Sequence, residues 1–146
     1  MKLQKATELA LYSILEFAAN PTAQVSAAEI AEKYGVSPHH LAKVLRDLGR
    51  AGLVESTRGV GGGYRFAGNA KRLTLFDVIE LFETLGPEPG FQDAATPGER
   101  ALARVTSEID EIAKATFRSI TIDTMLKLVG REEGAALTAA ATAPGR

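Results

Sequence analysis

The sequence predicts a mainly α-helical fold that carries one small β-hairpin. Apolar residues recur at steps of three and four along most of the chain, which is typical of helices with one buried face. Capping residues stand before several of these runs, and one glycine-rich segment, 59–63, separates two short runs typical of strands. With 146 residues, of which 45% are hydrophobic, the chain is long enough for one domain with an appended element.

The first two helices are marked by apolar spacing and by capping residues. Apolar side chains at steps of three and four predict the first helix over 3–19. Ser26 and Glu29 form a capping box, in which each side chain accepts a backbone hydrogen bond from the other residue, so the second helix is expected over 27–34. Gly35 then ends it, because glycine readily adopts the left-handed conformation that follows many helices.

A third helix and the hairpin follow. Ser37 can cap a helix that begins at Pro38, where the missing N–H of proline costs nothing, and this helix is expected to run to about residue 51. The segments 53–58 and 64–67 are the strand-like runs. The glycines between them suit the reversing turn of a hairpin.

A short helix, a linker and a long helix make up the next part of the chain. Thr74 caps a helix that is expected to end near Leu85. Two prolines and two glycines predict a linker loop over 86–96. Thr96, with proline in the first turn after it, caps a long helix that is expected over 97–118.

The long helix carries a narrow apolar stripe whose members step by three or four residues, nearly a heptad repeat. The residues expected at a dimer interface are Leu102, Val105, Ile109, Ile112, Thr116, Phe117 and Ile120. A long tethered helix with such a stripe favours a partner helix, and packing on its own domain is the alternative. Thr121 predicts one more, short helix, and the tail from Gly130 on, rich in Ala, Thr and Gly, is expected to be disordered.

Two short helices joined by a tight turn, with a helix before them and a hairpin after them, form the pattern of a winged helix-turn-helix. This domain is expected over 1–85, followed by the linker 86–96, the long dimerisation helix and short terminal helix over 97–129, and the tail 130–146. The architecture predicted is therefore a winged helix-turn-helix plus a long dimerisation helix.

Positive charge is concentrated around the third helix and the hairpin. Residues 1–72 hold ten Lys and Arg against six Asp and Glu, whereas residues 73–146 hold seven against twelve. Within 36–72 there are seven basic and two acidic side chains. A short positive segment on an otherwise acidic chain favours a polyanionic partner, although an ordinary solvated surface gives the same composition.

The third helix has the residue types that reading double-stranded DNA requires. A recognition helix enters the major groove with its first turns against the base edges, and its later exposed positions approach the phosphates. The candidates for base contacts are Ser37, His39, His40 and Lys43, and those for phosphate contacts are Arg46 and Arg50. On the hairpin, Arg58 and Arg65 supply positive charge, and Arg58 precedes a turn slim enough to lie along the minor groove.

Three segments carry a resemblance to a known family: VSAAEIA at 25–31, LGRAGLVESTRGVGGGY at 48–64 and LTLFDVI at 73–79. In this order they resemble the Rrf family of bacterial regulators, which includes IscR, NsrR and CymR, and the similarity covers about residues 1–130. The resemblance implies a transcription regulator, expected to be a repressor, that forms a symmetric homodimer through the long helix and reads a near-palindromic operator. It also implies DNA contacts for the residues of the third helix and, in the wing, for Arg58 and Tyr64.

The chain departs from that family in its metal ligands. Cluster-binding members carry cysteines before the dimerisation helix, whereas this chain has no cysteine, so we expect no cofactor and no metal site. The neighbours His39 and His40 point about 100° apart on a helix and have no ligating partner three or four positions away. Glu8 is interpreted as a surface or interface carboxylate, and a role as a ligand from the first helix stays open.

Other function classes are disfavoured. Without cysteine and without a nucleophile–base pair in a supporting motif, the chain is not expected to be an enzyme. It has neither a run of about 20 apolar residues nor a signal peptide, so we expect a cytoplasmic protein without a membrane partner. The glycine-rich segment lacks the Gly-Lys-Ser/Thr ending of a nucleotide-binding loop.

Two alternatives stay open at this level. The first is a winged helix that has lost DNA binding and serves as a protein-interaction module. The second concerns regulation: an unidentified small-molecule effector is expected at the junction of Phe82, Leu85 and Phe91 with the long helix near Leu102, and control by protein abundance alone is the alternative.

Overall fold

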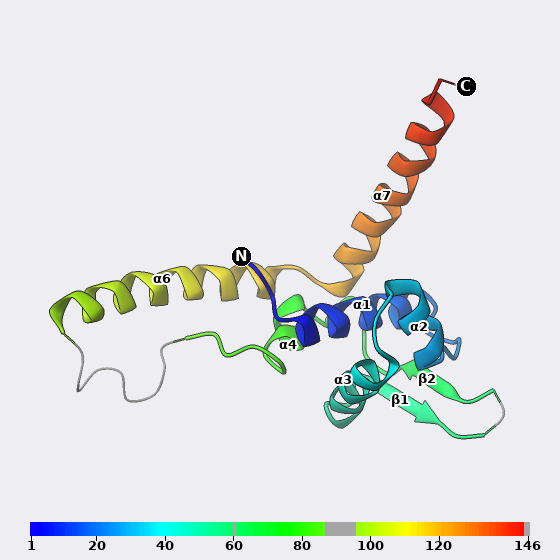
Figure 1. Cartoon of the computed structure of the whole chain (residues 1–146), viewed down its shortest axis with the longest axis horizontal. Helices are drawn as coiled ribbons and strands as arrows, with labels where there is room; N and C mark the ends of the chain where they lie inside the picture. Colours follow the sequence, from blue (N-terminus) through cyan, green and yellow to red (C-terminus); the bar gives the residue numbers. More distant parts are fainter. Residues whose placement is uncertain (60, 87–95, 145–146) are drawn as a thin grey trace.

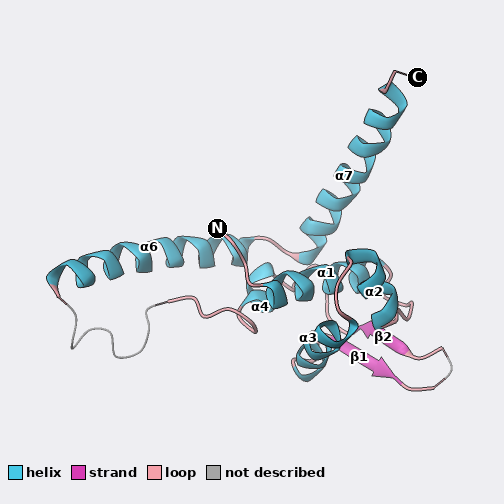
Figure 2. Ribbon diagram, in the orientation of Figure 1, coloured by secondary structure: helices cyan, strands magenta, loops and turns pink. Residues whose placement is uncertain are grey.

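The computed structural model describes residues 1–59, 61–86 and 96–144, and it confirms a mainly helical fold with one hairpin (Figures 1 and 2). In chain order the elements are α1 (Lys5–Ala19), α2 (Ala27–Tyr34), α3 (Pro38–Arg50), β1 (Val54–Thr57), β2 (Gly63–Phe66), α4 (Leu75–Ile79), α6 (Pro97–Ser119) and α7 (Ile122–Thr142). Helices α1 to α4 and the hairpin gather into one body, and α6 and α7 extend from it in different directions (Figure 1).

The capping residues form the contacts that the sequence predicts. The Ser26 Oγ accepts a hydrogen bond from the Glu29 amide at 3.2 Å, and the Glu29 Oε2 accepts one from the Ser26 amide at 2.7 Å. Gly35 ends α2 with a φ of 61°. The Thr96 side chain and Glu99 form the same reciprocal pair at the start of α6. Side-chain caps begin α2, α3 and α6, which explains why the predicted starts of these three helices agree with the structure.

Helix α1 lies at the centre of the body and packs against α3, α4 and the start of α7. Its buried apolar face meets the buried face of α3. The fully buried apolar side chains of these two helices include Leu9, Ala10, Ile14, Phe17, Leu41, Val44, Leu45 and Leu48. Burying an apolar side chain of this size contributes about 1.5–3 kcal/mol, so this layer holds α3 in place while its opposite face stays open to solvent.

The hairpin is antiparallel, and one isolated β-bridge attaches it to the rest of the body. Val54 of β1 is paired with Phe66 of β2. Tyr64 exchanges two backbone hydrogen bonds with Val25, of 2.9 and 2.8 Å, at the residue before the N-cap of α2. A Cβ on Gly63 would lie 2.8 Å from the Val25 oxygen, so only glycine allows this close approach.

The prediction that the fourth helix reaches Leu85 is wrong, because α4 ends at Ile79. Beyond it the backbone makes a tighter turn, in which the Phe82 amide donates a hydrogen bond to the Ile79 oxygen at 3.0 Å. Glu83 then turns towards α1, where its Oε1 accepts hydrogen bonds from the Gln4 amide at 2.6 Å and the Thr7 hydroxyl at 2.8 Å. A tertiary contact therefore replaces the last helical turn that the apolar pattern suggested.

The short last helix and disordered tail predicted for the C-terminal part are also wrong. Helix α7 continues from Ile122 to Thr142, well past Gly130, although its outer part is exposed. Alanine has the highest helix propensity, so the Ala-rich segment sustains a helix even where it has little to bury. The linker predicted over 86–96 lies almost entirely outside the described residues. No helix in the described part of the chain is long and apolar enough to cross a membrane.

Candidate nucleic-acid interface

Helix α3 presents a polar face beside the hairpin. The Ser37 Oγ caps it by accepting a hydrogen bond from the His40 amide at 3.4 Å. Its apolar residues are buried against α1, which leaves the opposite side chains at the surface. Of the predicted contact residues, Ser37, His39, Lys43, Arg46, Arg50, Arg58 and Arg65 are exposed, while His40 and Tyr64 are half-buried.

A groove of about 740 Å³ separates α3 from the hairpin. Arg46 lines it from the helix, and Arg58 and Tyr64 line it from the hairpin. The structure therefore brings together candidates from two different elements, the recognition helix and the hairpin. Because both walls carry arginine, the groove is suited to a polyanion that touches the helix and the hairpin together.

The basic side chains differ in what they contact. Arg50 lies 3.5 Å from Asp47, and Arg65 lies 3.1 Å from Glu55 on the neighbouring strand. By contrast, Lys43, Arg46 and Arg58 have no carboxylate within 4 Å among residues 1–59, 61–86 and 96–144. Exposed ion pairs contribute little to stability, so both sets keep their charge available to a phosphate.

Tyr64 has a structural contact that the sequence did not suggest. Its ring lies 6.2 Å from that of Phe17, centroid to centroid, and its backbone pairs with Val25. The side chain thus connects the hairpin to the core, with one edge left on the groove. In this position it sets the angle of the hairpin as well as lining the candidate DNA surface.

Sequence reasoning missed two hydroxyl side chains, Ser56 and Thr57, which also line the groove. Thr57 closes the base of the turn, where its Oγ1 accepts a hydrogen bond from the Gly63 amide at 3.2 Å. Their place on the strand that faces α3 was the signal that could have identified them, because small hydroxyl residues commonly bond phosphates.

An interaction between α1 and α2 supports the helix-turn-helix from behind. The Glu16 Oε1 accepts hydrogen bonds from the Lys33 ammonium at 2.6 Å and the Tyr34 hydroxyl at 2.7 Å. Tyr34 stacks on Tyr12 with ring centroids 4.8 Å apart. Burial raises the pKa of Glu16, but the hydrogen bonds from Lys33 and Tyr34 outweigh it, so this pKa lies below its ordinary value. Burial and the bond to Glu16 raise the pKa of Tyr34.

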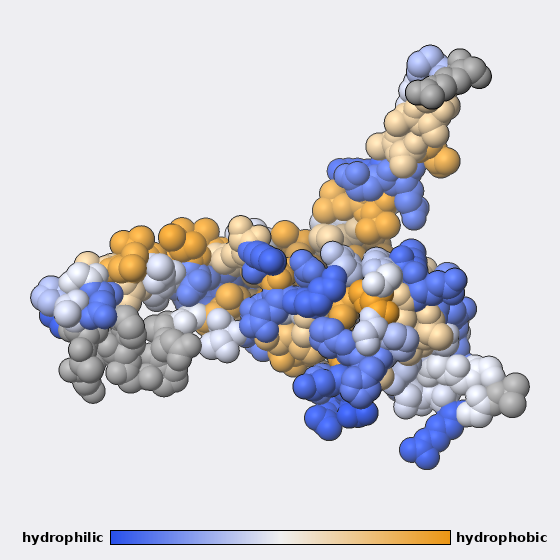
Figure 3. Space-filling model, viewed as in Figure 1, coloured by the Kyte–Doolittle hydropathy of each residue, from blue (hydrophilic) through white to orange (hydrophobic). Residues whose placement is uncertain are grey.

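The residues predicted for a dimer interface fall into two groups. Leu102, Val105, Ile109 and Ile112 are 54–69% exposed, and no residue of α6 is fully buried. Figure 3 shows apolar surface along this helix. Thr116 is exposed as well. Phe117 and Ile120 are instead half-buried, and the Ile120 oxygen accepts a hydrogen bond from the Leu75 amide of α4 at 2.9 Å.

The predicted effector junction is wrong in one member. Leu102 lies near the outer end of α6 and is 65% exposed, whereas the end of α6 beside α4 carries Lys114 and Arg118 (Figure 1). Leu102 precedes Lys114 by three helical turns, or about 18 Å at 1.5 Å per residue. Leu85 does face α6, while Phe91 lies outside the described residues.

A three-helix core, a helix with a basic exposed face and a hairpin with a basic turn define a winged-helix DNA-binding protein. The chain belongs to the Rrf2 family, described as iron-dependent transcriptional regulators, whose model matches residues 3–128. It is a DNA-binding transcription regulator.

Relatives agree with this assignment. The chain is 56% identical over 135 residues to a Rhodopseudomonas palustris protein named HTH-type transcriptional regulator BadM, covering 90% of this chain and 85% of BadM. Among solved structures it is similar to CymR (YrzC), the global cysteine regulator of B. subtilis, with 26% identity, a TM-score of 0.72 and coverage of 88% and 98%. It is also similar to T. potens IscR, with 26% identity, a TM-score of 0.67 and coverage of 88% of both chains.

The donor atoms of this chain do not fit a cysteine-held iron–sulfur cluster. The sequence contains no cysteine, and thiolate is the ligand that such clusters require. Within the described residues, no group of three or more His, Asp or Glu side chains is placed to hold a metal ion. Glu8, the ligand candidate on the first helix, lies 3.7 Å from the Lys5 ammonium.

Proposed function

We propose that the protein is a homodimeric repressor that binds a near-palindromic operator and does so without a cysteine-ligated cluster. The observation that carries this proposal is the contrast between the winged-helix domain, whose apolar side chains form one buried core, and the four exposed apolar residues of α6. Pairing α6 with a second copy would cover this stripe and set two α3 helices side by side. A two-fold dimer is matched by a two-fold symmetric site.

The proposal assigns the contacts by position. The first turns of α3 carry the base-reading side chains Ser37, His39, His40 and Lys43. Arg46 and Arg50 lie further along the same exposed face and bind phosphates, which position the helix without reading sequence. Arg58 enters the minor groove from the hairpin, Arg65 supports it from the outer strand face, and Tyr64 holds the hairpin against the core. Acting on chromosomal DNA, the protein works in the cytoplasm and needs no catalytic activity.

A mobility-shift titration with the DNA upstream of the protein's own gene tests the proposal. If the dimer neutralises roughly 6–10 phosphates, raising salt from about 50 to 200 mM weakens binding by about 10³–10⁵. A complex that is insensitive to salt, or a chain that sediments as a monomer at micromolar concentration, would contradict it. Failure to bind any upstream DNA would favour a protein-interaction module instead.

Four variants distinguish residues that contact phosphates from residues that contact bases. Arg46→Ala and Arg50→Ala should weaken binding to specific and nonspecific DNA about equally, because phosphates are the same in both. His40→Ala and Lys43→Ala should reduce the difference between the two DNAs, by roughly 1–3 kcal/mol for each lost base contact. Equal losses on both DNAs from all four variants would show that α3 is placed wrongly in the groove.

A further inference from the structure

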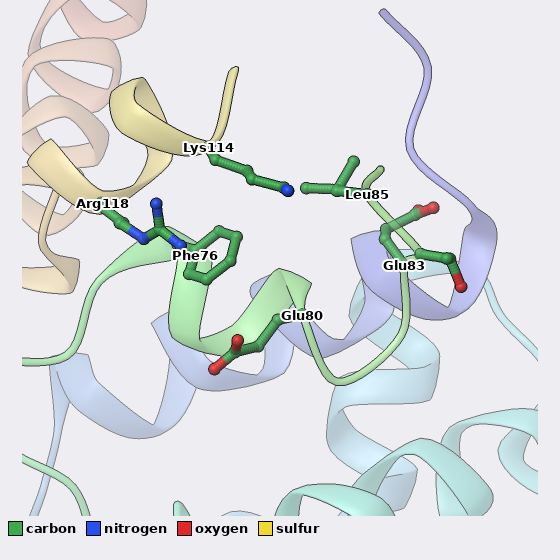
Figure 4. A pocket seen from close by; sticks show the side chains of 7 residues that line it. Phe76, Glu80, Glu83, Leu85, Lys114 and Arg118 are labelled. Atoms are coloured by element: carbon green, nitrogen blue, oxygen red, sulfur yellow. The ribbon is translucent and has the colours of Figure 1, made fainter. Parts of the chain in front are cut away.

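A cavity of about 320 Å³ lies between α4 and the C-terminal half of α6, on the side of the body away from the hairpin (Figure 4). Pockets for small molecules begin at about this size. Phe76 and Leu85 provide apolar wall, and charged side chains from both helices complete the lining. The cavity is therefore large enough for a small amphipathic molecule with one charged end.

Two cations of α6 face this cavity. The Lys114 side chain is only 17% exposed and points across the cavity towards Leu85 (Figure 4). Its ammonium donates one hydrogen bond, of 2.7 Å, to Glu111, whose side chain is 65% exposed and lies outside the lining of the cavity. The Arg118 guanidinium lies 4.2 Å from the Phe76 ring centroid and has no carboxylate within 4 Å in the described part of the chain.

The two carboxylates that line the cavity do not neutralise these cations. Glu83 Oε1 already accepts hydrogen bonds from the Gln4 amide and the Thr7 hydroxyl of the α1 region. Glu80 is exposed, and its carboxylate points away from Lys114 (Figure 4). An ammonium and a guanidinium thus flank an apolar wall. Lys114 gives one of its three N–H donors to Glu111, which leaves two for an anionic group, and the planar guanidinium of Arg118 suits a carboxylate.

We propose that this cavity binds a small organic monocarboxylate. Its carboxylate accepts hydrogen bonds from Arg118 and Lys114, and its hydrocarbon part covers Phe76 and Leu85. Burying the hydrocarbon against these two side chains supplies the apolar part of the affinity, and the two cations select for negative charge.

Such a ligand is placed to affect α3, and this regulatory part rests on the proposed function. The cavity lies between α6 and α4, Glu83 connects the segment after α4 to the start of α1, and α1 packs on α3. A ligand that favours one angle between α6 and the body changes the spacing of the two α3 helices in a dimer. The ligand can change the DNA affinity only to the extent that it binds one angle between α6 and the body more tightly than another.

Calorimetric titration of the full-length protein with hexanoate, in the absence of DNA, tests the site. Hexanoate should bind saturably, while acetate, which lacks the hydrocarbon part, and hexanol, which lacks the charge, should bind at least about tenfold more weakly. Lys114→Gln and Arg118→Gln should each weaken hexanoate binding by about tenfold or more. The matched control Arg104→Gln removes the same charge from the exposed outer half of α6 and should leave binding unchanged.

Each outcome decides between the site and the wider function. No hexanoate binding up to about 10 mM, equal binding by wild type and the two variants, or equal binding of hexanol overturns the site. Because Arg118 also packs on Phe76, circular dichroism of Arg118→Gln checks that this variant is folded like the wild type. Lys114→Gln tests the same site independently of that contact. Hexanoate binding without DNA binding refutes the proposed function alone. Unchanged DNA affinity at saturating hexanoate contradicts only the regulatory part.

Discussion

The body formed by α1 to α4 and the arm formed by α6 use the same apolar residue types at the same helical spacing, with opposite results. In α1, Ile14 and Phe17 are completely buried, whereas in α6 Ile109 and Ile112 are 56% and 69% exposed. Both patterns specify one apolar face. Within the described residues, that of α1 is covered by α3, α4 and α7, whereas Leu102, Val105, Ile109 and Ile112 on α6 stay exposed. Spacing therefore predicts that a face exists, and the arrangement of other elements decides what covers it.

The largest effect should come from the centre of the body. Phe17→Ala leaves a cavity between α1 and the ring of Tyr64, so the free energy of unfolding should fall by about 3–5 kcal/mol. Urea denaturation followed by fluorescence or circular dichroism measures this loss, and the loss should not depend on protein concentration. A concentration-dependent loss would mean that the body, like the arm, relies on a second copy.

The next largest effect should be on the association of two copies of the chain. Ile109→Ala removes buried apolar surface twice in a symmetric dimer, so association should weaken by about 2–4 kcal/mol, which raises the dimer Kd by about 30-fold or more. Sedimentation velocity across a concentration series measures it. Leu137→Ala on α7, an apolar residue that is 74% exposed but outside the stripe, is the control and should leave the Kd unchanged. Equal effects from both variants would contradict the proposed interface.

A smaller, pH-dependent effect is expected at the contact between α1 and α2. Glu16→Gln should lower the free energy of unfolding by about 1–2 kcal/mol at pH 7, because Glu16 accepts two hydrogen bonds as a carboxylate. Since the folded pKa lies below the ordinary 4.5, the stabilisation is complete above pH 4.5 and is lost as the pH falls through the folded pKa. Unfolding curves of both proteins should therefore converge in acid. A constant difference down to pH 3 would refute this assignment.

The smallest effect should come from the outer part of α7. A chain that ends after Gly130 should keep its free energy of unfolding within about 0.5 kcal/mol, because the removed residues are exposed. Its helical circular dichroism signal should fall, since α7 extends to Thr142. If the truncation destabilised the protein by more than about 1 kcal/mol, the outer part of α7 would have to pack on something, and a second copy would be the first candidate to test.

Local sequence patterns determined where helices begin, which face of α3 is polar and which metal ligands the chain lacks. The capping pairs Ser26 with Glu29 and Thr96 with Glu99 mark two helix starts, because a cap depends on residues three positions apart. The polar face of α3 was equally predictable, since the period of 3.6 places Lys43 opposite the buried Val44 and Leu48 side of the helix. The total absence of cysteine likewise needs no structure to exclude a thiolate-held cluster.

Only the tertiary structure decided how distant segments meet. Glu83 draws the chain to α1 and ends α4 early, and Tyr64 joins the hairpin to Phe17, although nothing in their local sequence specifies either partner. The sequence placed an effector junction near Leu102, but the orientation of α6 brings Arg118 to α4 instead. Helical periodicity fixes which side chains share a face, whereas the direction in which a helix leaves the body depends on packing between residues far apart in the chain.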